Sequence, residues 1–98
     1  MPTPENKIKA RLKRALVPFG AKIYQFWPVQ TGYGKKTLDC LLCVHGQFIA
    51  IETKAPGKTM TALQVETACQ IIVAGGKVFL VDGPDGIDRV VGYILSLI

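Results

Sequence analysis

The clearest hydrophobic pattern in the chain lies within residues 37–54, where two apolar runs flank His45-Gly46. Runs rich in aliphatic and β-branched residues on either side of a two-residue turn predict a β-hairpin. Gly46 supplies the positive φ that such a turn requires. Both faces of the two expected strands are apolar, so we expect the hairpin to be covered on both sides.

The hairpin register brings two acids together. A two-residue loop places Asp39 directly opposite Glu52, and Lys54 shares the face of Glu52 because side chains alternate along a strand. Facing carboxylates need a nearby cation, or one of them must hold a proton. The pattern fits either a divalent-cation site beside an ammonium or a structural ion cluster at the sheet edge. A three-residue loop would shift the pairing by one and separate the acids.

The remaining pattern predicts three helices and two further strands. They are a helix opened by Thr3-Pro4-Glu5, a strand over 22–29, a helix between the capping box at 61–64 and the stop at Gly75-Gly76, a strand over 77–82, and a helix following Pro84-Asp85-Gly86. The order helix, three strands, helix, strand, helix predicts one α/β domain over residues 1–98, with a mixed central sheet flanked by helices.

The last predicted helix is apolar around most of its circumference, more than one core-facing stripe needs. Either it is buried on two sides within one chain, or its outer face packs on another chain. In a domain this small we expect the second arrangement, as a symmetric homodimer, because twofold dimers are the commonest closed assembly.

The formal net charge of +5 favours a polyanionic partner. Cations crowd the first helix and the loop before the hairpin, at Lys7, Lys9, Arg11, Lys13, Arg14, Lys35 and Lys36. On the helix they are either an ordinary solvated face or contacts to phosphate groups. Tyr33 with the two loop lysines is either a plain flexible loop or an arm that touches backbone phosphates.

Three cysteines, an odd number, argue against a disulfide framework and for a reducing, cytoplasmic compartment. Cys40 and Cys43 cannot share a zinc ion, because strand positions three apart point to opposite faces. We expect both, and Cys69 in the following helix, to be buried apolar residues. No apolar run approaches the ~18 residues of a membrane span, and the charged start is not that of a signal peptide.

The order of the acids and the lysine resembles the signature of the PD-(D/E)XK nuclease superfamily, carried by Asp39 and by Glu52-Thr53-Lys54 on the next strand. The compact layout of residues 32–39 is most similar to the VRR-NUC branch, particularly its small stand-alone phage-type members. The resemblance covers residues 3–82. Leu38 departs from it, since the superfamily often has proline before the aspartate; that proline shapes the backbone and carries no chemistry.

This resemblance implies a restriction-endonuclease-like core and a Mg²⁺- or Mn²⁺-dependent endonuclease without a small-molecule cofactor. The implied substrate is branched DNA such as a four-way junction, and phage-type members would act in the host cytoplasm. The rival interpretation is a non-catalytic basic module that only binds nucleic acid. The expected nucleic-acid contacts are Tyr33, Lys35, Lys36, Lys58, Lys9 and Lys13.

The resemblance also implies a set of cation ligands. Asp39, Glu52 and the main-chain carbonyl of Thr53 would bind the cation, and Glu5 would complete the set directly or through water. Glu5 has an equally adequate explanation as a favourable charge at a helix N-terminus.

Two further residues receive catalytic roles from the resemblance. Lys54 would orient or deprotonate the attacking water and stabilise the transition state. Gln64 would contact the active site or the DNA backbone from the helix after the hairpin, although its position in a capping box explains it without any function.

Overall fold

The helices and strands follow the order that the hydrophobic pattern predicts. The structure, a computed structural model, describes residues 2–30 and 34–98. Its elements are α1 (Pro4–Leu16), the 3₁₀ helix η1 (Val17–Lys22), β1 (Tyr24–Phe26), β2 (Cys40–Val44), β3 (Gln47–Thr53), α2 (Ala62–Val73), β4 (Lys77–Val81) and α3 (Pro84–Leu97). The predicted α/β class and mixed sheet are therefore confirmed, and the first strand is shorter than the range 22–29 predicted for it.

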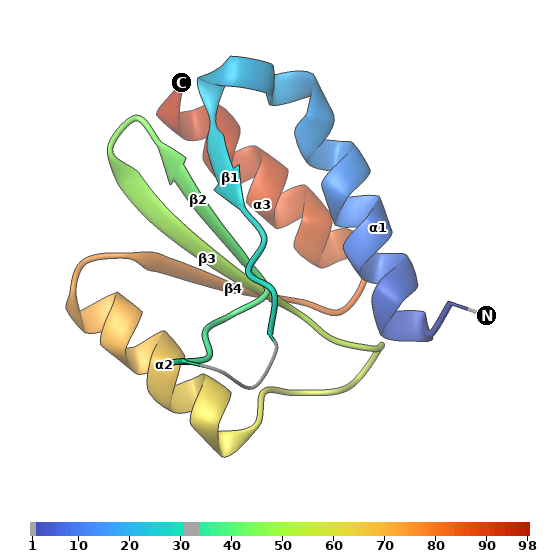
Figure 1. The fold of residues 1–98 in the computed structure, drawn as a ribbon. Helices are drawn as coiled ribbons and strands as arrows, with labels where there is room; N and C mark the ends of the chain where they lie inside the picture. The colour runs from blue at the N-terminus through green and yellow to red at the C-terminus, as the bar shows by residue number, and fades with distance from the viewer. Residues whose placement is uncertain (1, 31–33) are drawn as a thin grey trace.

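Four strands form one mixed sheet in the order β1-β2-β3-β4 (Figure 1). The first three are antiparallel, and β4 runs parallel to β3. The hairpin register is the predicted one, with Cys40 opposite Ile51. His45 and Gly46 have φ angles of 49° and 81°, the positive values of a type I′ turn. The two-residue loop therefore fixes which strand residues share a face.

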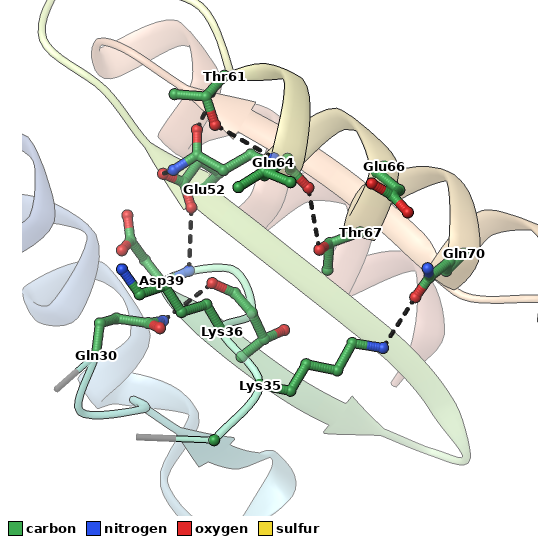
Figure 2. Close-up of a pocket in the computed structure, with 13 residues that line it drawn as sticks. Gln30, Lys35, Lys36, Asp39, Glu52, Thr61, Gln64, Glu66, Thr67 and Gln70 are labelled. Atoms are coloured by element: carbon green, nitrogen blue, oxygen red, sulfur yellow. Dashed lines mark hydrogen bonds between the residues drawn. The ribbon is translucent and has the colours of Figure 1, made fainter. Parts of the chain in front are cut away.

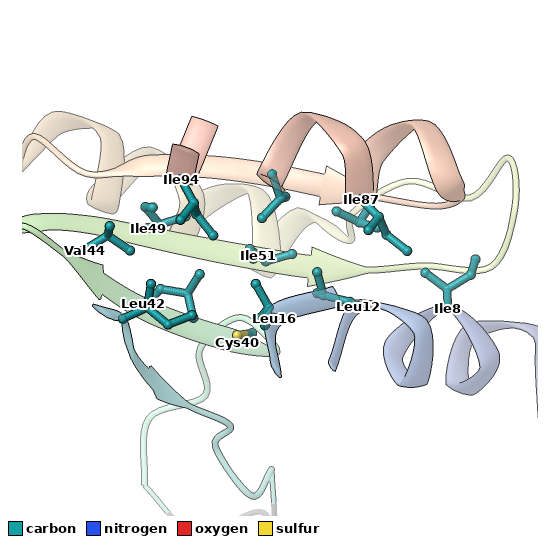
Figure 3. Packing of buried hydrophobic residues seen from close by; sticks show 13 residues of the cluster. Ile8, Leu12, Leu16, Cys40, Leu42, Val44, Ile49, Ile51, Ile87 and Ile94 are labelled. Carbon is teal, nitrogen blue, oxygen red and sulfur yellow. The ribbon is translucent and has the colours of Figure 1, made fainter. Parts of the chain in front are cut away.

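The helices α1 and α3 cover one face of the sheet (Figure 1). The side chain of Thr3 caps α1 by accepting a hydrogen bond from the backbone N–H of Asn6 at 3.1 Å. Aliphatic side chains from both helices interdigitate with alternate residues of the strands (Figure 3). Among these core residues are Ile8, Leu12, Leu16, Cys40, Leu42, Val44, Ile49, Ile51, Val90 and Ile94.

The other face of the sheet is only partly covered, by α2. The buried cluster between this face and α2 consists of Leu38, Ala50 and Ala68. Because α2 packs closest to β4, the side chains that β1 and β2 direct to this face remain accessible. Cys43 is exposed, as is Cys69 on α2 itself. The prediction that these two cysteines are buried is therefore wrong, whereas Cys40 is buried as predicted.

The helix α3 is buried within this one chain. Ile87, Val90 and Ile94 point into the core between α1 and the sheet. Gly86 lets the helix start close to β4, since a Cβ there would lie 3.1 Å from the Cα of Val81. Its outward positions are mostly polar or small, at Asp85, Asp88, Arg89, Gly92 and Ser96, with Leu95 the apolar exception.

Burial on two sides within one chain, the first of the two arrangements considered, is therefore the one found, and few apolar side chains remain on the outer face of α3; the homodimer stays a prediction. The apolar positions of α3 are mostly buried inside the domain, because α3 is covered by both α1 and the sheet.

Among the residues that the structure describes, no helix has the length and apolar character needed to cross a membrane.

Candidate functional site

Asp39 and Glu52 meet at one end of the sheet, where β2 begins and β3 ends (Figure 2). The backbone N–H of Asp39 donates to Oε1 of Glu52 at 3.2 Å. Asp39 lies one residue before β2, so it faces Glu52 from a bend and not from a paired strand position. The expected proximity of the two acids is confirmed, whereas the direct pairing of Asp39 opposite Glu52 is not found.

The carboxylate of Asp39 is held from two sides. Its Oδ2 accepts hydrogen bonds from the backbone N–H of Thr53 at 2.9 Å and from the hydroxyl of Thr53 at 2.7 Å. Its Oδ1 lies 3.7 Å from the Nζ of Lys9 on α1. Thr53 is fully buried, so its hydroxyl keeps this bond without competition from water. Asp39 is thereby fixed in orientation.

The side chain of Thr53 is a feature that the sequence analysis missed, because it assigned only the main-chain carbonyl of this residue. The available signal was a hydroxyl on the core-facing side of β3, where Ile49 and Ile51 are aliphatic. A buried hydroxyl needs a hydrogen-bond partner, and an acid was expected next to it.

Glu52 is the more deeply buried acid, with 3% of its surface exposed. Its Oε2 accepts from Nε2 of Gln64 at 2.9 Å and lies 3.6 Å from Nζ of Lys54. Burial, and next the charge of Asp39, raise the pKa of Glu52 to about 7; Lys54 and the N–H of Asp39 oppose the rise only in part. Burial is therefore the main reason that Glu52 resists ionisation, and the charge of Asp39 adds to it.

Gln64 performs two tasks with one amide. Its Oε1 accepts from the backbone N–H of Thr61 at 2.9 Å, which closes the predicted capping box of α2. Its Nε2 is then left to donate to Glu52. Because the cap needs an acceptor at Oε1, the amide orientation follows from the hydrogen bonds. The structural and functional explanations of this residue are therefore compatible.

Glu5 takes a more distant place. It lies in the first turn of α1, where an acid is favourable, and its charge makes the smallest contribution to the raised pKa of Glu52. Within residues 2–30 and 34–98, no three Asp, Glu, His or Cys side chains are arranged to hold a metal ion together. The direct-ligand role expected for Glu5 beside Asp39 and Glu52 is thus not supported.

A cleft of about 750 Å³ opens from the acid pair and continues along α2 (Figure 2). Asp39, Glu52 and Gln64 line its inner end, and Lys35 and Lys36 line the wall formed by the loop before β2. The two loop lysines therefore lie where the sequence analysis expects contacts near the acids.

Gln30 shapes the backbone in front of Asp39. Its Nε2 donates to the carbonyls of Thr37 at 3.0 Å and Leu38 at 3.4 Å, and Leu38 is fully buried. These bonds constrain the segment at the position where the resembled superfamily often has proline. No sequence pattern singled out Gln30, because its partners are main-chain atoms of another loop segment.

Among the residues that the structure describes, the other expected nucleic-acid contacts do not line the cleft. Lys9 pairs with Asp39, and the Nζ of Lys13 lies over the ring of Trp27 at 4.7 Å from its centre. Lys58 belongs to the turn after β3, where its backbone N–H bonds to Ala55. Tyr33 lies outside the described residues.

Comparison with known proteins adds no family. A scan against protein-family models finds no match, and a search of curated proteins finds no similar sequence. The chemistry that this site can perform has to be argued from its own residues.

Proposed function

We propose that this protein is a Mg²⁺- or Mn²⁺-dependent endonuclease that hydrolyses phosphodiester bonds in DNA. The observation that carries the proposal is the pair of half-buried Asp39 and buried Glu52, bonded to each other's segments, with the pKa of Glu52 raised to about 7. Burial and the neighbouring carboxylate disfavour the ionised form of Glu52. A bound divalent cation would stabilise the ionised forms of both acids.

The donor set fits a hard divalent cation. Mg²⁺ is usually held by one or two carboxylates together with waters and substrate phosphates, so two acids suffice. Asp39 and Glu52 would supply them. The N–H of Thr53 is directed at Asp39, and the N–H and C=O of one strand residue point to the same side. The carbonyl of Thr53 would therefore be a third oxygen ligand.

A bound cation would make a water molecule more acidic and offset charge on the scissile phosphate. Lys54 would act beside it: its ammonium, held near Glu52, would stabilise the charge that develops on the phosphate and orient the attacking water. The backbone N–H of Lys54 bonds to the carbonyl of Val81 at 2.9 Å, which anchors this residue to β4. Gln64 acts as a positioning residue for Glu52.

The substrate follows from charge and shape. The net charge of +5 and the lysines of the cleft favour a nucleic-acid backbone, and the small domain favours recognition of DNA structure over base sequence. We propose branched DNA, such as a four-way junction, as the preferred substrate. Two sites related by a twofold axis would cut two strands of such a junction.

A homodimer would use the open face of the sheet. Tyr24, Cys43 and Phe48 form a cross-strand row there, and Tyr24 and Phe48 are 67% and 42% exposed. Exposed aromatic residues grouped on one face are typical of protein interfaces. Sedimentation equilibrium should give twice the mass of one chain for the native protein and one chain mass for Tyr24→Lys/Phe48→Lys.

The decisive experiment is a cleavage assay on purified protein with a four-way junction, a flap, a linear duplex and a single strand. We expect cleavage with Mg²⁺ or Mn²⁺, most rapid on the junction, and none with excess chelator. Salt-sensitive binding of the same DNA without cleavage under any metal condition would instead support the rival, a non-catalytic basic module.

A further inference from the structure

The cleft extends well beyond the acid pair, and its second half has no assigned role. Along α2 the side chains facing it recur every third residue, at Gln64, Thr67 and Gln70 (Figure 2). With a rise of 1.5 Å per residue, these positions span about 9 Å of helix. A single nucleic-acid strand advances about 3.4 Å per stacked base, so the span matches two or three nucleotides.

The two walls of the cleft differ in charge. The loop wall carries the ammonium groups of Lys35 and Lys36, whereas the α2 wall offers amides and a hydroxyl, with the carboxylate of Glu66 at its rim. Phosphates are drawn to the first wall and repelled by Glu66 on the second. Neutral amides, in contrast, are suited to hydrogen-bonding base edges. The hydroxyl of Thr67 donates to the carbonyl of Leu63 and keeps its acceptor capacity.

One hydrogen bond connects the walls. The Nζ of Lys35 donates to Oε1 of Gln70 at 3.1 Å across the outer end of the cleft. An ammonium bonded to a neutral amide gains by exchanging it for a phosphate oxygen, because the attraction between opposite charges is added to the hydrogen bond. That exchange would release the Gln70 amide for a base.

We propose that this cleft binds two or three unpaired nucleotides adjoining the scissile phosphate, with their phosphates on Lys35 and Lys36 and their bases on Thr67 and Gln70. The inference rests on the proposed function and deepens it. A volume of about 750 Å³ is that of a small-ligand pocket, which matches a short single strand and is too small to enclose a duplex. In branched DNA, the strand that enters the cleft would be unpaired next to the branch point, on one side of the cut.

The test uses metal-free protein, so that it does not depend on cleavage. Trinucleotides d(TTT) and d(AAA) are titrated into ¹⁵N-labelled protein at several salt concentrations. We expect NMR chemical-shift changes in the side-chain amides of Gln64 and Gln70 and in the backbone amides of residues 34–37. Shifts confined to other surfaces, or no binding at millimolar concentration, would overturn the proposal.

Substitutions on the two walls of the cleft should have different effects on trinucleotide binding. Lys35→Ala should weaken both trinucleotides equally, by about fivefold, and reduce the slope of log affinity against log salt by about 0.7, the value for one phosphate of a single strand. Gln70→Leu should leave that slope unchanged and alter the ratio of the two affinities at least threefold. Glu66→Gln should strengthen both.

The matched control is Lys22→Ala, an exposed lysine of η1 that does not line the cleft. If it changes the affinity and salt slope as much as Lys35→Ala, the proposal is wrong, since binding is then merely to net charge. Thermal unfolding of each variant checks that the fold is kept.

Trinucleotide binding at these residues in a protein that never cleaves DNA would overturn the proposed nuclease function alone. Cleavage by a protein whose trinucleotide shifts avoid the cleft would overturn this subsite alone.

Discussion

The two faces of the sheet differ in how much they bury. On the side of α1 and α3, 13 buried residues form one continuous core, whereas the side of α2 buries three. The first face therefore supplies most of the stability of the domain. The second leaves room for the cleft and for exposed aromatic residues. Rigidity for the acid pair is supplied from behind the sheet, while the pair opens onto the cleft on the side of α2.

Neighbouring residues of β3 connect the two faces. Thr53 points into the core side and bonds Asp39, while Glu52 points to the side of α2 and bonds Gln64. Strand alternation makes this division possible, since successive side chains point to opposite faces. The acid pair therefore makes hydrogen bonds on both sides of the sheet, so substitutions on each side should have separable effects.

The largest effect is expected at the acids themselves. Asp39→Asn and Glu52→Gln should each lower the rate of metal-dependent DNA cleavage by at least about 1,000-fold, equivalent to about 4 kcal/mol, because each removes a charged cation ligand. Urea unfolding at the assay pH checks that both variants remain folded, so that the loss of rate belongs to the site. Single-turnover cleavage measures the rate, with Asp88→Asn on the exposed side of α3 as control. Unchanged rates in either acid variant would refute the site.

The next effect tests the core side. Leu12→Ala, at a fully buried position of α1, should lower the free energy of unfolding by about 2–5 kcal/mol, through lost burial and a residual cavity. Leu63→Ala, at a position of α2 that is 75% exposed, should lower it by less than about 0.5 kcal/mol. Urea unfolding measures both. Equal losses would contradict the division between the two faces.

The pH dependence of stability is expected to report on Glu52. Its pKa is about 7 in the folded protein and about 4.3 in an unfolded chain. The folded state then binds more protons between these values, so this group's contribution is complete below pH 4 and is lost as the pH rises to 7. Without metal, the wild type should lose roughly 1–3 kcal/mol relative to Glu52→Gln across this window. A constant difference between the two proteins from pH 4 to 8 would show that the pKa of Glu52 is not raised.

The smallest effect is expected from the hydroxyl behind the site. Thr53→Val keeps the size of the side chain and the backbone N–H but removes the hydroxyl donor to Asp39. We expect Mn²⁺ affinity to fall about tenfold, as for other outer-sphere supports of a metal ligand. Thr53→Ser should retain most of the affinity, which isothermal titration can measure. Equal weakening in the two variants would mean that the methyl group matters and the hydroxyl does not.

Local signals were sufficient for the parts of the fold that depend on neighbouring residues. The turn at His45-Gly46 determines the hairpin register, and that register brings the bend at Asp39 next to Glu52. Likewise, the capping box locates the start of α2, and its geometry directs Gln64 to the acid pair.

Predictions failed where the answer depends on which helix covers which face. Apolar periodicity makes Cys43 look like a core residue, yet α2 lies too near β4 to cover it. The same limit applies to α3, whose apolar circumference is enclosed by α1. Thr67 and Gln70 resemble ordinary solvated helix positions, and only the tertiary placement of the loop before β2 makes them a cleft wall.

The double bonding of Gln64 has a further consequence for the opening motions of the molecule. If the first turn of α2 frays, Glu52 loses its amide partner in the same event. By reciprocity, whatever favours the bonded orientation of Glu52 must slow the fraying of that turn. The protection of the backbone amides of residues 64–67 against hydrogen exchange should therefore rise when a ligand binds the acids, even when that ligand is too small to contact the helix.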